Sequence, residues 1–159
     1  MPTPLIDDAM PHHFCLSVGD REAAIEWWRA MFAFTVESRF EIPHIKARGA
    51  FLRHGAMRIE IFEIEGSEPA PGSRLRPNTD LQVQGVKHFC FAVSEVQPAL
   101  EKLHRAGVRI AGVARGVGTP MREEADPTLR DGMLPATAFF ITDPWGSLVE
   151  ILARTNFPE

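Results

Sequence analysis

Two short stretches of this chain repeat each other: His13-Phe14-Cys15-Leu16-Ser17-Val18 and His88-Phe89-Cys90-Phe91-Ala92-Val93. A second pair lies further along each half, Ile59-Glu60-Ile61 and Val149-Glu150-Ile151. Self-similarity of this kind indicates two copies of one supersecondary unit joined in tandem. Each copy therefore brings one histidine and one glutamate to equivalent places.

The composition is that of an ordinary globular chain. Its 159 residues suffice for one domain, or for one domain made of two fused units. The net charge is −4 and the basic residues are scattered, which argues against nucleic acid as a partner. No apolar run reaches the ~18 residues of a membrane span. Residues 1–11 lack the pattern of a signal peptide, so we expect a cytoplasmic protein with no membrane contact.

Alternation with a period of two predicts the first strand at about 12–18. Its apolar residues alternate with His13, Cys15 and Ser17, so the two sets point to opposite faces of a sheet. The apolar set is expected to pack against a helix. By the same alternation, Glu60 lies on the face opposite Ile59 and Ile61.

A helical pattern follows each histidine-bearing strand. Asp20 is expected to cap the first helix, and Trp28 lies on its apolar stripe. Ser94 and Gln97 match a capping box for the second helix. Gly107 is expected to end that helix in a left-handed conformation.

The pattern of strands and helices predicts an α+β fold of two βαβββ modules in tandem. Further strands are expected at about 34–40, 45–53, 57–64, 88–93, 108–113, 137–142 and 147–153. The predicted parts are an N-terminal arm at 1–11, a first module at 12–64, a linker at 65–86, a second module at 87–153 and a tail at 154–159. Proline and glycine mark the linker.

The second module contains an insertion. His13 and Glu60 are 47 positions apart, whereas His88 and Glu150 are 62 apart, and the extra residues map to about 114–135. Long loops inside compact domains are usually functional or disordered, so this one is a candidate lid or substrate-binding segment. Its arginines Arg115, Arg122 and Arg130 could anchor an anionic group of a substrate or could be solvated loop charges balanced by nearby carboxylates.

Cys15 and Cys90 stand two residues after the two histidines, in strand-like runs that do not suit a disulfide scaffold. They lie on the same strand face as the histidines, so they could also be ligands. We favour the interpretation that each is a small buried residue that packs beside the site. Reduced thiols fit a cytosolic compartment.

His13, Glu60, His88 and Glu150 are each expected on the face of a strand that points away from the helices. Two imidazoles and two carboxylates suit one divalent transition metal: nickel, zinc, cobalt, iron or manganese. A six-coordinate ion held by four protein ligands keeps two positions open. Two adjacent open positions suit a small-molecule substrate that offers two neighbouring oxygens.

The paired His strands, the Glu strands and the ending Asp143-Pro144-Trp145-Gly146 resemble the vicinal oxygen chelate superfamily, which contains glyoxalase I, bleomycin resistance proteins and dioxygenases. The resemblance is closest to the glyoxalase I-like branch, which carries ligands of these types at four such positions. It implies that the sheets of the two modules curl into a mixed-sheet cup around the metal. A homodimer is the default expectation, because an open cup leaves sheet edges that need cover.

The resemblance also implies a reaction. A glyoxalase I-like lyase or isomerase abstracts a proton alpha to a carbonyl and stabilises a metal-chelated enediolate. Glu150 is then the first candidate for the catalytic base, and Glu60 could return the proton on the other face. The positions that bind glutathione in bacterial glyoxalase I hold Ser17 and Ile64 here, so the resemblance does not extend to the glutathione-binding residues, and the thiol carrier stays open.

Three other functions remain open within the same superfamily. An acyl-CoA epimerase would share the chemistry, although such enzymes typically have Gln where Glu60 stands. An extradiol-type dioxygenase would use His13, His88 and Glu150 as an iron triad, and Glu60 argues against it. A non-catalytic drug-binding protein would have a weak metal site or none.

Overall fold

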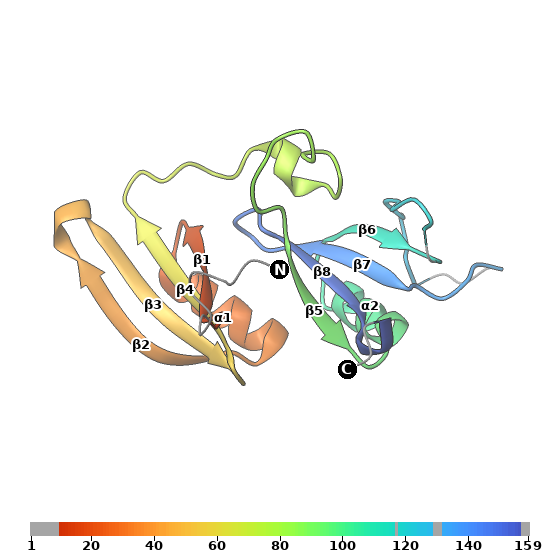
Figure 1. The fold of residues 1–159 in the computed structure, drawn as a ribbon, viewed down its shortest axis with the longest axis horizontal. Helices are drawn as coiled ribbons and strands as arrows, with labels where there is room; N and C mark the ends of the chain where they lie inside the picture. The colour runs from red at the N-terminus through yellow and green to blue at the C-terminus, as the bar shows by residue number, and fades with distance from the viewer. Residues whose placement is uncertain (1–9, 117, 129–131, 157–159) are drawn as a thin grey trace, which may run out of the picture. The chain divides into compact units, whose positions relative to one another are not determined.

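The computed structural model describes residues 10–116, 118–128 and 132–156. The chain divides into two compact units between Glu68 and Pro69. Each unit has the order strand, helix, strand, strand, strand (Figure 1). The predicted α+β fold of two tandem βαβββ modules is therefore confirmed. Within the described ranges, none of the helices has the length and apolar character needed to cross a membrane.

The first unit is a four-stranded mixed sheet with one helix. Its elements are β1 (His13–Val18), α1 (Arg21–Phe32), β2 (Thr35–Ile42), a short 3₁₀ turn (Pro43–Ile45), β3 (Ala47–His54) and β4 (Met57–Ile64). The strands lie in the order β1-β4-β3-β2, with β1 parallel to β4 and the other pairs antiparallel. The first and last strands of the unit are thus neighbours.

The second unit repeats this topology. After a 3₁₀ turn (Gly72–Leu75) come β5 (Phe89–Val93), α2 (Val96–Arg105), β6 (Ile110–Ala114), β7 (Ala138–Thr142), β8 (Leu148–Ala153) and a 3₁₀ turn (Arg154–Asn156). The order is β5-β8-β7-β6, and only β5 and β8 are parallel. Each predicted strand is present, with ends that differ by at most two residues.

The core of the first unit lies between its sheet and α1. The Asp20 carboxylate accepts a hydrogen bond from the backbone N–H of Ala23 at 3.0 Å, so the predicted N-cap is confirmed. Trp28 is fully buried, as are Ile59 and Ile61 of β4. Because successive side chains of a strand alternate between faces, Glu60 points to the face opposite the core. The helix thereby fixes which face of the sheet carries polar groups.

The predicted capping box of α2 is wrong. The N-cap of this helix is Glu95, which makes no side-chain capping bond. The Gln97 side chain is instead buried, and its oxygen accepts a hydrogen bond from the backbone N–H of Ala136 at 2.9 Å. The partner that takes Gln97 away from the cap is 39 residues distant. Gly107 has a φ of 76°, which confirms the predicted left-handed ending.

Residues 70–77, in the segment that joins β4 to β5, belong to the second unit and pack against its sheet. A Cβ added to Gly146 in the turn between β7 and β8 would lie 2.5 Å from the Cβ of Ala70 and 3.1 Å from Leu75. A Cβ added to Gly112 of β6 would lie 3.4 Å from Pro77. Two glycines of the second unit therefore let this segment lie directly against the sheet.

Candidate metal centre

The first His–Glu pair joins β1 and β4. His13 Nε2 lies 3.3 Å from Glu60 Oε2. In the parallel register His13 faces Arg58 and Cys15 faces Glu60, so the pair is diagonal on one sheet face. The Glu60 side chain is 18% exposed and that of His13 is 34% exposed. Both groups can therefore be reached from the face of the sheet that lacks the helix.

The second pair repeats this geometry between β5 and β8. His88 Nε2 lies 3.2 Å from Glu150 Oε2. Cys90 faces Glu150 in the parallel register, as Cys15 faces Glu60. The repeat of the sequence is thus a repeat of side-chain placement.

A phenylalanine stands against each histidine. The ring of His13 meets Phe51 of β3 edge to face, with centroids 5.4 Å apart, and His88 meets Phe140 of β7 in the same way at 5.0 Å. Phe51 is paired with Glu60 across the strands, and Phe140 with Glu150. Such contacts restrict the imidazole orientation. These two residues were not predicted from the sequence, although a phenylalanine nine or ten positions before each glutamate was a usable signal.

The cysteines lie beside the carboxylates on the same face. Both are exposed, so the expectation that they are buried is wrong: each points away from the helix-covered face. The pKa of the Cys15 thiol is raised to about 11. The largest cause is partial desolvation of the sulfur, and the charge of Glu60 and a hydrogen bond to Glu60 add to it. The same causes, with Glu150 as the neighbour, raise the pKa of Cys90 to about 12. Both thiols are therefore protonated at neutral pH.

The donor atoms of each pair fit two ligands of one ion. Imidazole nitrogen and carboxylate oxygen bind transition metals at ~2.0–2.2 Å, so two ligands at right angles are ~3 Å apart. The His–Glu distances of 3.3 and 3.2 Å are close to this value. Over the described part of the chain, no group of three or more His, Cys, Asp or Glu residues is placed to hold a metal. Each unit thus supplies one His–Glu pair of the four expected ligands.

The sheet face around the first pair is aromatic. Phe40 of β2 lies 5.6 Å from Phe51 and 5.5 Å from Phe62 of β4, measured between ring centroids. The Phe40 ring covers Gly49, where an added Cβ would lie 2.2 Å from its tip. The Arg58 guanidinium in this region donates to the Glu37 carboxylate at 2.7 and 3.0 Å. Glu37 also lies 3.4 Å from Arg53. The first pair therefore has an apolar wall and, beside it, two arginines that share one carboxylate.

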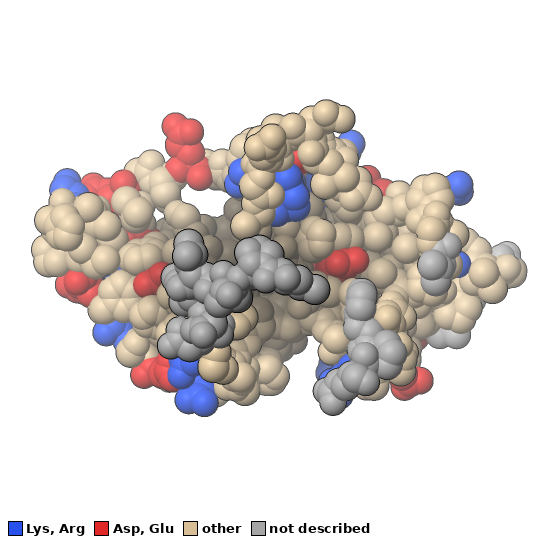
Figure 2. Space-filling model, in the orientation of Figure 1, with Lys and Arg blue, Asp and Glu red and all other residues tan. Residues whose placement is uncertain are grey.

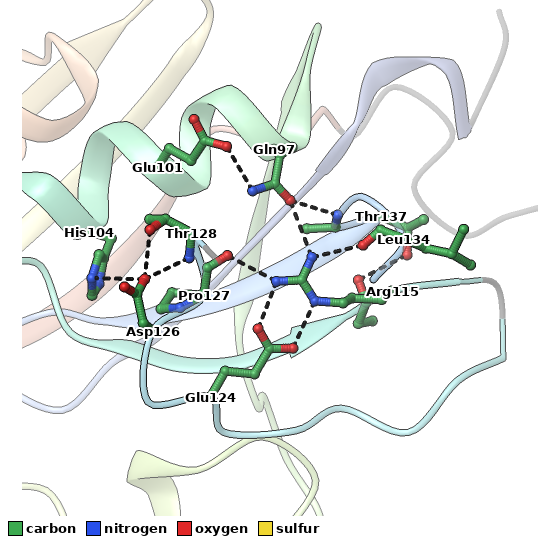
Figure 3. A network of polar contacts seen from close by, with 12 residues as sticks. Gln97, Glu101, His104, Arg115, Glu124, Asp126, Pro127, Thr128, Leu134 and Thr137 are labelled. Carbon is green, nitrogen blue, oxygen red and sulfur yellow. Dashed lines mark hydrogen bonds and ion pairs between the residues drawn. The ribbon is translucent and has the colours of Figure 1, made fainter. Parts of the chain in front are cut away.

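The described part of the insertion is organised around Arg115 (Figure 3). Its guanidinium donates two hydrogen bonds to the Glu124 carboxylate, at 2.9 and 2.7 Å. It also donates to the carbonyl oxygens of Pro127 and Leu134 and to the side-chain oxygen of Gln97. Because these N–H groups have acceptors within the chain, we interpret Arg115 as a residue that shapes the loop.

Arg122 and Arg130 are the other two arginines of the insertion. Arg122 is exposed, and its backbone pairs with Val113 of β6 through hydrogen bonds of 2.7 and 3.0 Å. Its expected contact with substrate stays a prediction. Arg130 lies outside the described residues.

Comparison with known proteins identifies the family. The model of the Glyoxalase/Bleomycin resistance protein/Dioxygenase superfamily matches residues 11–151. The chain therefore belongs to this superfamily. No curated protein sequence matches it.

Solved structures show the same fold at low identity. The trypanothione-dependent glyoxalase I of Leishmania major is 17% identical, with a TM-score of 0.64 over 94% of this chain and 89% of that one. The fosfomycin resistance protein FosX of Listeria monocytogenes, complexed with Mn(II) and sulfate, is 15% identical, with a TM-score of 0.56 over 92% of each chain. A glyoxalase I mutant from Zea mays is 20% identical, with a TM-score of 0.61 over 90% of this chain and 44% of that one.

Proposed function

We propose that this protein is a metal-dependent lyase or isomerase that removes a proton alpha to a carbonyl, as glyoxalase I does. The observation that carries the proposal is the duplicated pair, His13 with Glu60 and His88 with Glu150, at 3.3 and 3.2 Å. The proposed ligand set is these four residues around one divalent transition metal. Mn(II) in the FosX structures supports a divalent ion for the superfamily.

The types and number of metal ligands distinguish the proposed function from a dioxygenase. A facial triad of two histidines and one carboxylate serves non-haem iron oxygenases. The duplicated glutamate supplies a fourth ligand and, with it, a second carboxylate at the reacting centre. The metal would supply Lewis-acid stabilisation of the charge that develops on the substrate oxygens. A substrate with two neighbouring oxygens fits two open positions.

The chain's own carboxylates move the proton in this proposal. Glu150 takes the proton from the carbon next to the carbonyl, and the C–H electron pair moves toward the carbonyl oxygen. Glu60 takes up the proton of the hydroxyl group on that carbon and delivers it to the neighbouring, former carbonyl carbon. Glu150 then gives its proton to the oxygen of the former carbonyl, so that every proton is accounted for. The Cys90 and Cys15 thiols lie beside these carboxylates and are protonated at neutral pH. They can therefore donate hydrogen bonds that steady each carboxylate.

Exchange of the substrate proton with solvent tests the proposal. The metal-loaded protein is incubated in D₂O with 2-oxoaldehyde–thiol adducts and with acyl-CoA epimers, and deuterium at the carbon is followed by NMR. Glu150→Gln is expected to slow the exchange by ~10² to 10⁴, the usual contribution of general acid–base catalysis. An established substrate on which Glu150→Gln keeps full activity, with metal bound, would show that Glu150 is not the base.

A homodimer is part of the proposal. Two double variants, His13→Ala with Glu60→Ala and His88→Ala with Glu150→Ala, report on the assembly when refolded together. If a centre combines pairs from two chains, the mixed dimer contains one centre with both pairs intact and recovers activity. A centre built within one chain gives no recovery. Sedimentation of the wild type should give twice the mass of the 17.7 kDa chain.

A further inference from the structure

A small pocket opens beside His88 in the second unit. It is lined by apolar Phe140, Leu148, Leu81 and Pro77 and by polar Arg74, Asn78, Asp80, Lys87 and His88. Leu148 and Phe140 lie on the same sheet face as Glu150, because they stand two positions away on β8 and opposite it on β7. The pocket therefore adjoins the second His–Glu pair.

The polar wall of the pocket has an excess of positive charge. Oδ2 of Asp80 lies 3.2 Å from Lys87 Nζ and 3.6 Å from Arg74 Nε. One carboxylate thus faces two cations, which gives the three groups a formal charge of +1. Figure 2 shows basic atoms gathered beside the segment between β4 and β5. The Arg74 side chain is 55% exposed. Its guanidinium has five N–H donors, more than its contact with Asp80 uses, so some can bind a ligand.

The cationic wall is held in place by its own loop. The Thr79 hydroxyl lies within hydrogen-bond distance of the carbonyl oxygens of Ser73 and Arg76, at 2.6 and 2.9 Å. Pro77 packs near Gly112, and Leu75 near Gly146. A binding wall that is already ordered loses little entropy when a ligand arrives.

The first His–Glu pair has different neighbours. The position two residues before Glu60 is Arg58, where the second unit has Leu148. Arg58 is bound by both oxygens of the Glu37 carboxylate. Glu37 also lies 3.4 Å from Arg53, so this cluster carries a formal charge of +1 as well. The two pairs therefore differ in the apolar Leu148 of the second unit rather than in local charge.

We propose that this pocket binds an oxyanion at one end of the substrate, held by Arg74 and Lys87. Phe140 and Leu148 would pack against the carbon atoms that join the oxyanion to the reacting centre. The substrate class is a small carbonyl compound with a carboxylate, phosphate or phosphonate group. The placement of the reacting carbon rests on the proposed function, whereas binding of the oxyanion does not.

Anion titration of the metal-free protein tests the pocket directly. Inorganic phosphate, methylphosphonate and acetate are added in turn, and the ring signals of His88, assigned by their loss in His88→Gln, are followed by NMR. We expect saturable shifts with at least one anion. Arg74→Gln and Lys87→Gln should each weaken binding about tenfold, which corresponds to ~1.4 kcal/mol. The order of the three anions identifies the group that the pocket prefers.

Two further variants separate recognition from structure. Arg76→Gln removes an exposed charge from the same loop but not from the pocket lining, and should leave the affinity unchanged. Asp80→Asn raises the formal charge of the wall to +2 and should tighten binding severalfold. A purely structural ion-pair cluster would be disrupted by all three pocket substitutions, Asp80→Asn included.

The outcomes are distinct from those of the metal proposal. Metal affinity should be unaffected in Arg74→Gln and Lys87→Gln, and thermal unfolding verifies that the variants fold. Absence of anion binding, equal binding by these two variants, or weaker binding by Asp80→Asn would overturn the pocket assignment. Metal binding by the Glu60 and Glu150 variants tests only the metal centre. Anion binding by the metal-free protein tests only the pocket.

Discussion

The guanidinium of Arg115 and the carboxylate of Glu124 meet through two parallel hydrogen bonds, at 2.9 and 2.7 Å, inside the insertion of the second unit. Their side chains are only 11% and 16% exposed. The glutamate raises the pKa of Arg115 further above its usual range, chiefly through the hydrogen bond. This contact closes a loop whose length and composition made it a candidate lid.

Arg115→Lys should destabilise the fold by ~2 kcal/mol. Lysine keeps the charge but cannot reproduce the two-pronged geometry, and it leaves the carbonyl of Pro127 or Leu134 without its donor. Urea unfolding measures the change. Arg105→Lys is the matched control, because its side chain is 67% exposed and lies 3.8 Å from Glu101. A cost for Arg115→Lys no larger than for this control would contradict the structural role.

Asp143→Asn should change the pH dependence of stability. Burial raises the pKa of Asp143 in the folded chain, although backbone hydrogen bonds from Ser147 and Trp145 oppose the shift. As the pH rises above the ordinary value of 3.8, the unfolded chain loses its proton first, so ionisation weakens folding. Asparagine has no proton to lose and can still accept both hydrogen bonds.

The measurement is the unfolding free energy of both proteins between pH 3.5 and 7, taken as roughly the range that brackets carboxyl titration. The stability of the wild type relative to Asp143→Asn should fall as the pH rises. A relative stability that increases with pH would mean that the folded chain favours the charged carboxylate.

Gly49→Ala should destabilise the first unit by ~1–3 kcal/mol, the usual cost of overpacking. The added Cβ would lie 2.2 Å from the tip of the Phe40 ring, which must move away from Phe51 and Phe62. Gly72→Ala is the control, because an added Cβ there has no neighbour within 4 Å. Thermal unfolding compares the two variants. Equal melting temperatures would show that Phe40 moves at no cost.

The strands and the first helix cap could be predicted because their signals are local. Alternation with a period of two placed His13 and Glu60 on the same type of face, and Asp20 needed only an N–H three residues away. The repeat supplied the second pair. These features depend on residues close together in sequence, so a single chain reveals them.

The features that were missed depend on distant partners. Gln97 follows Ser94 at capping-box spacing, but its side chain bonds Ala136 and Arg115 instead. The proline- and glycine-rich stretch before β5 has the composition of a linker, yet Pro77 packs by Gly112. The charged pocket beside His88 arises from that packing. The proline and glycine content of a segment predicts how its backbone can bend. It does not predict which surface the segment packs against.

Metal content tests the central claim most directly. Elemental analysis is made of protein purified without added metal or an affinity tag, and again after reconstitution with nickel, zinc, cobalt, iron and manganese in turn. Glu60→Ala is compared with Glu65→Ala, whose side chain is 77% exposed just beyond β4. We predict close to one transition-metal ion per chain in the wild type and Glu65→Ala, and a clear loss in Glu60→Ala. A wild-type protein that binds no metal even after reconstitution, or metal binding that is indifferent to Glu60, would contradict the four-ligand centre.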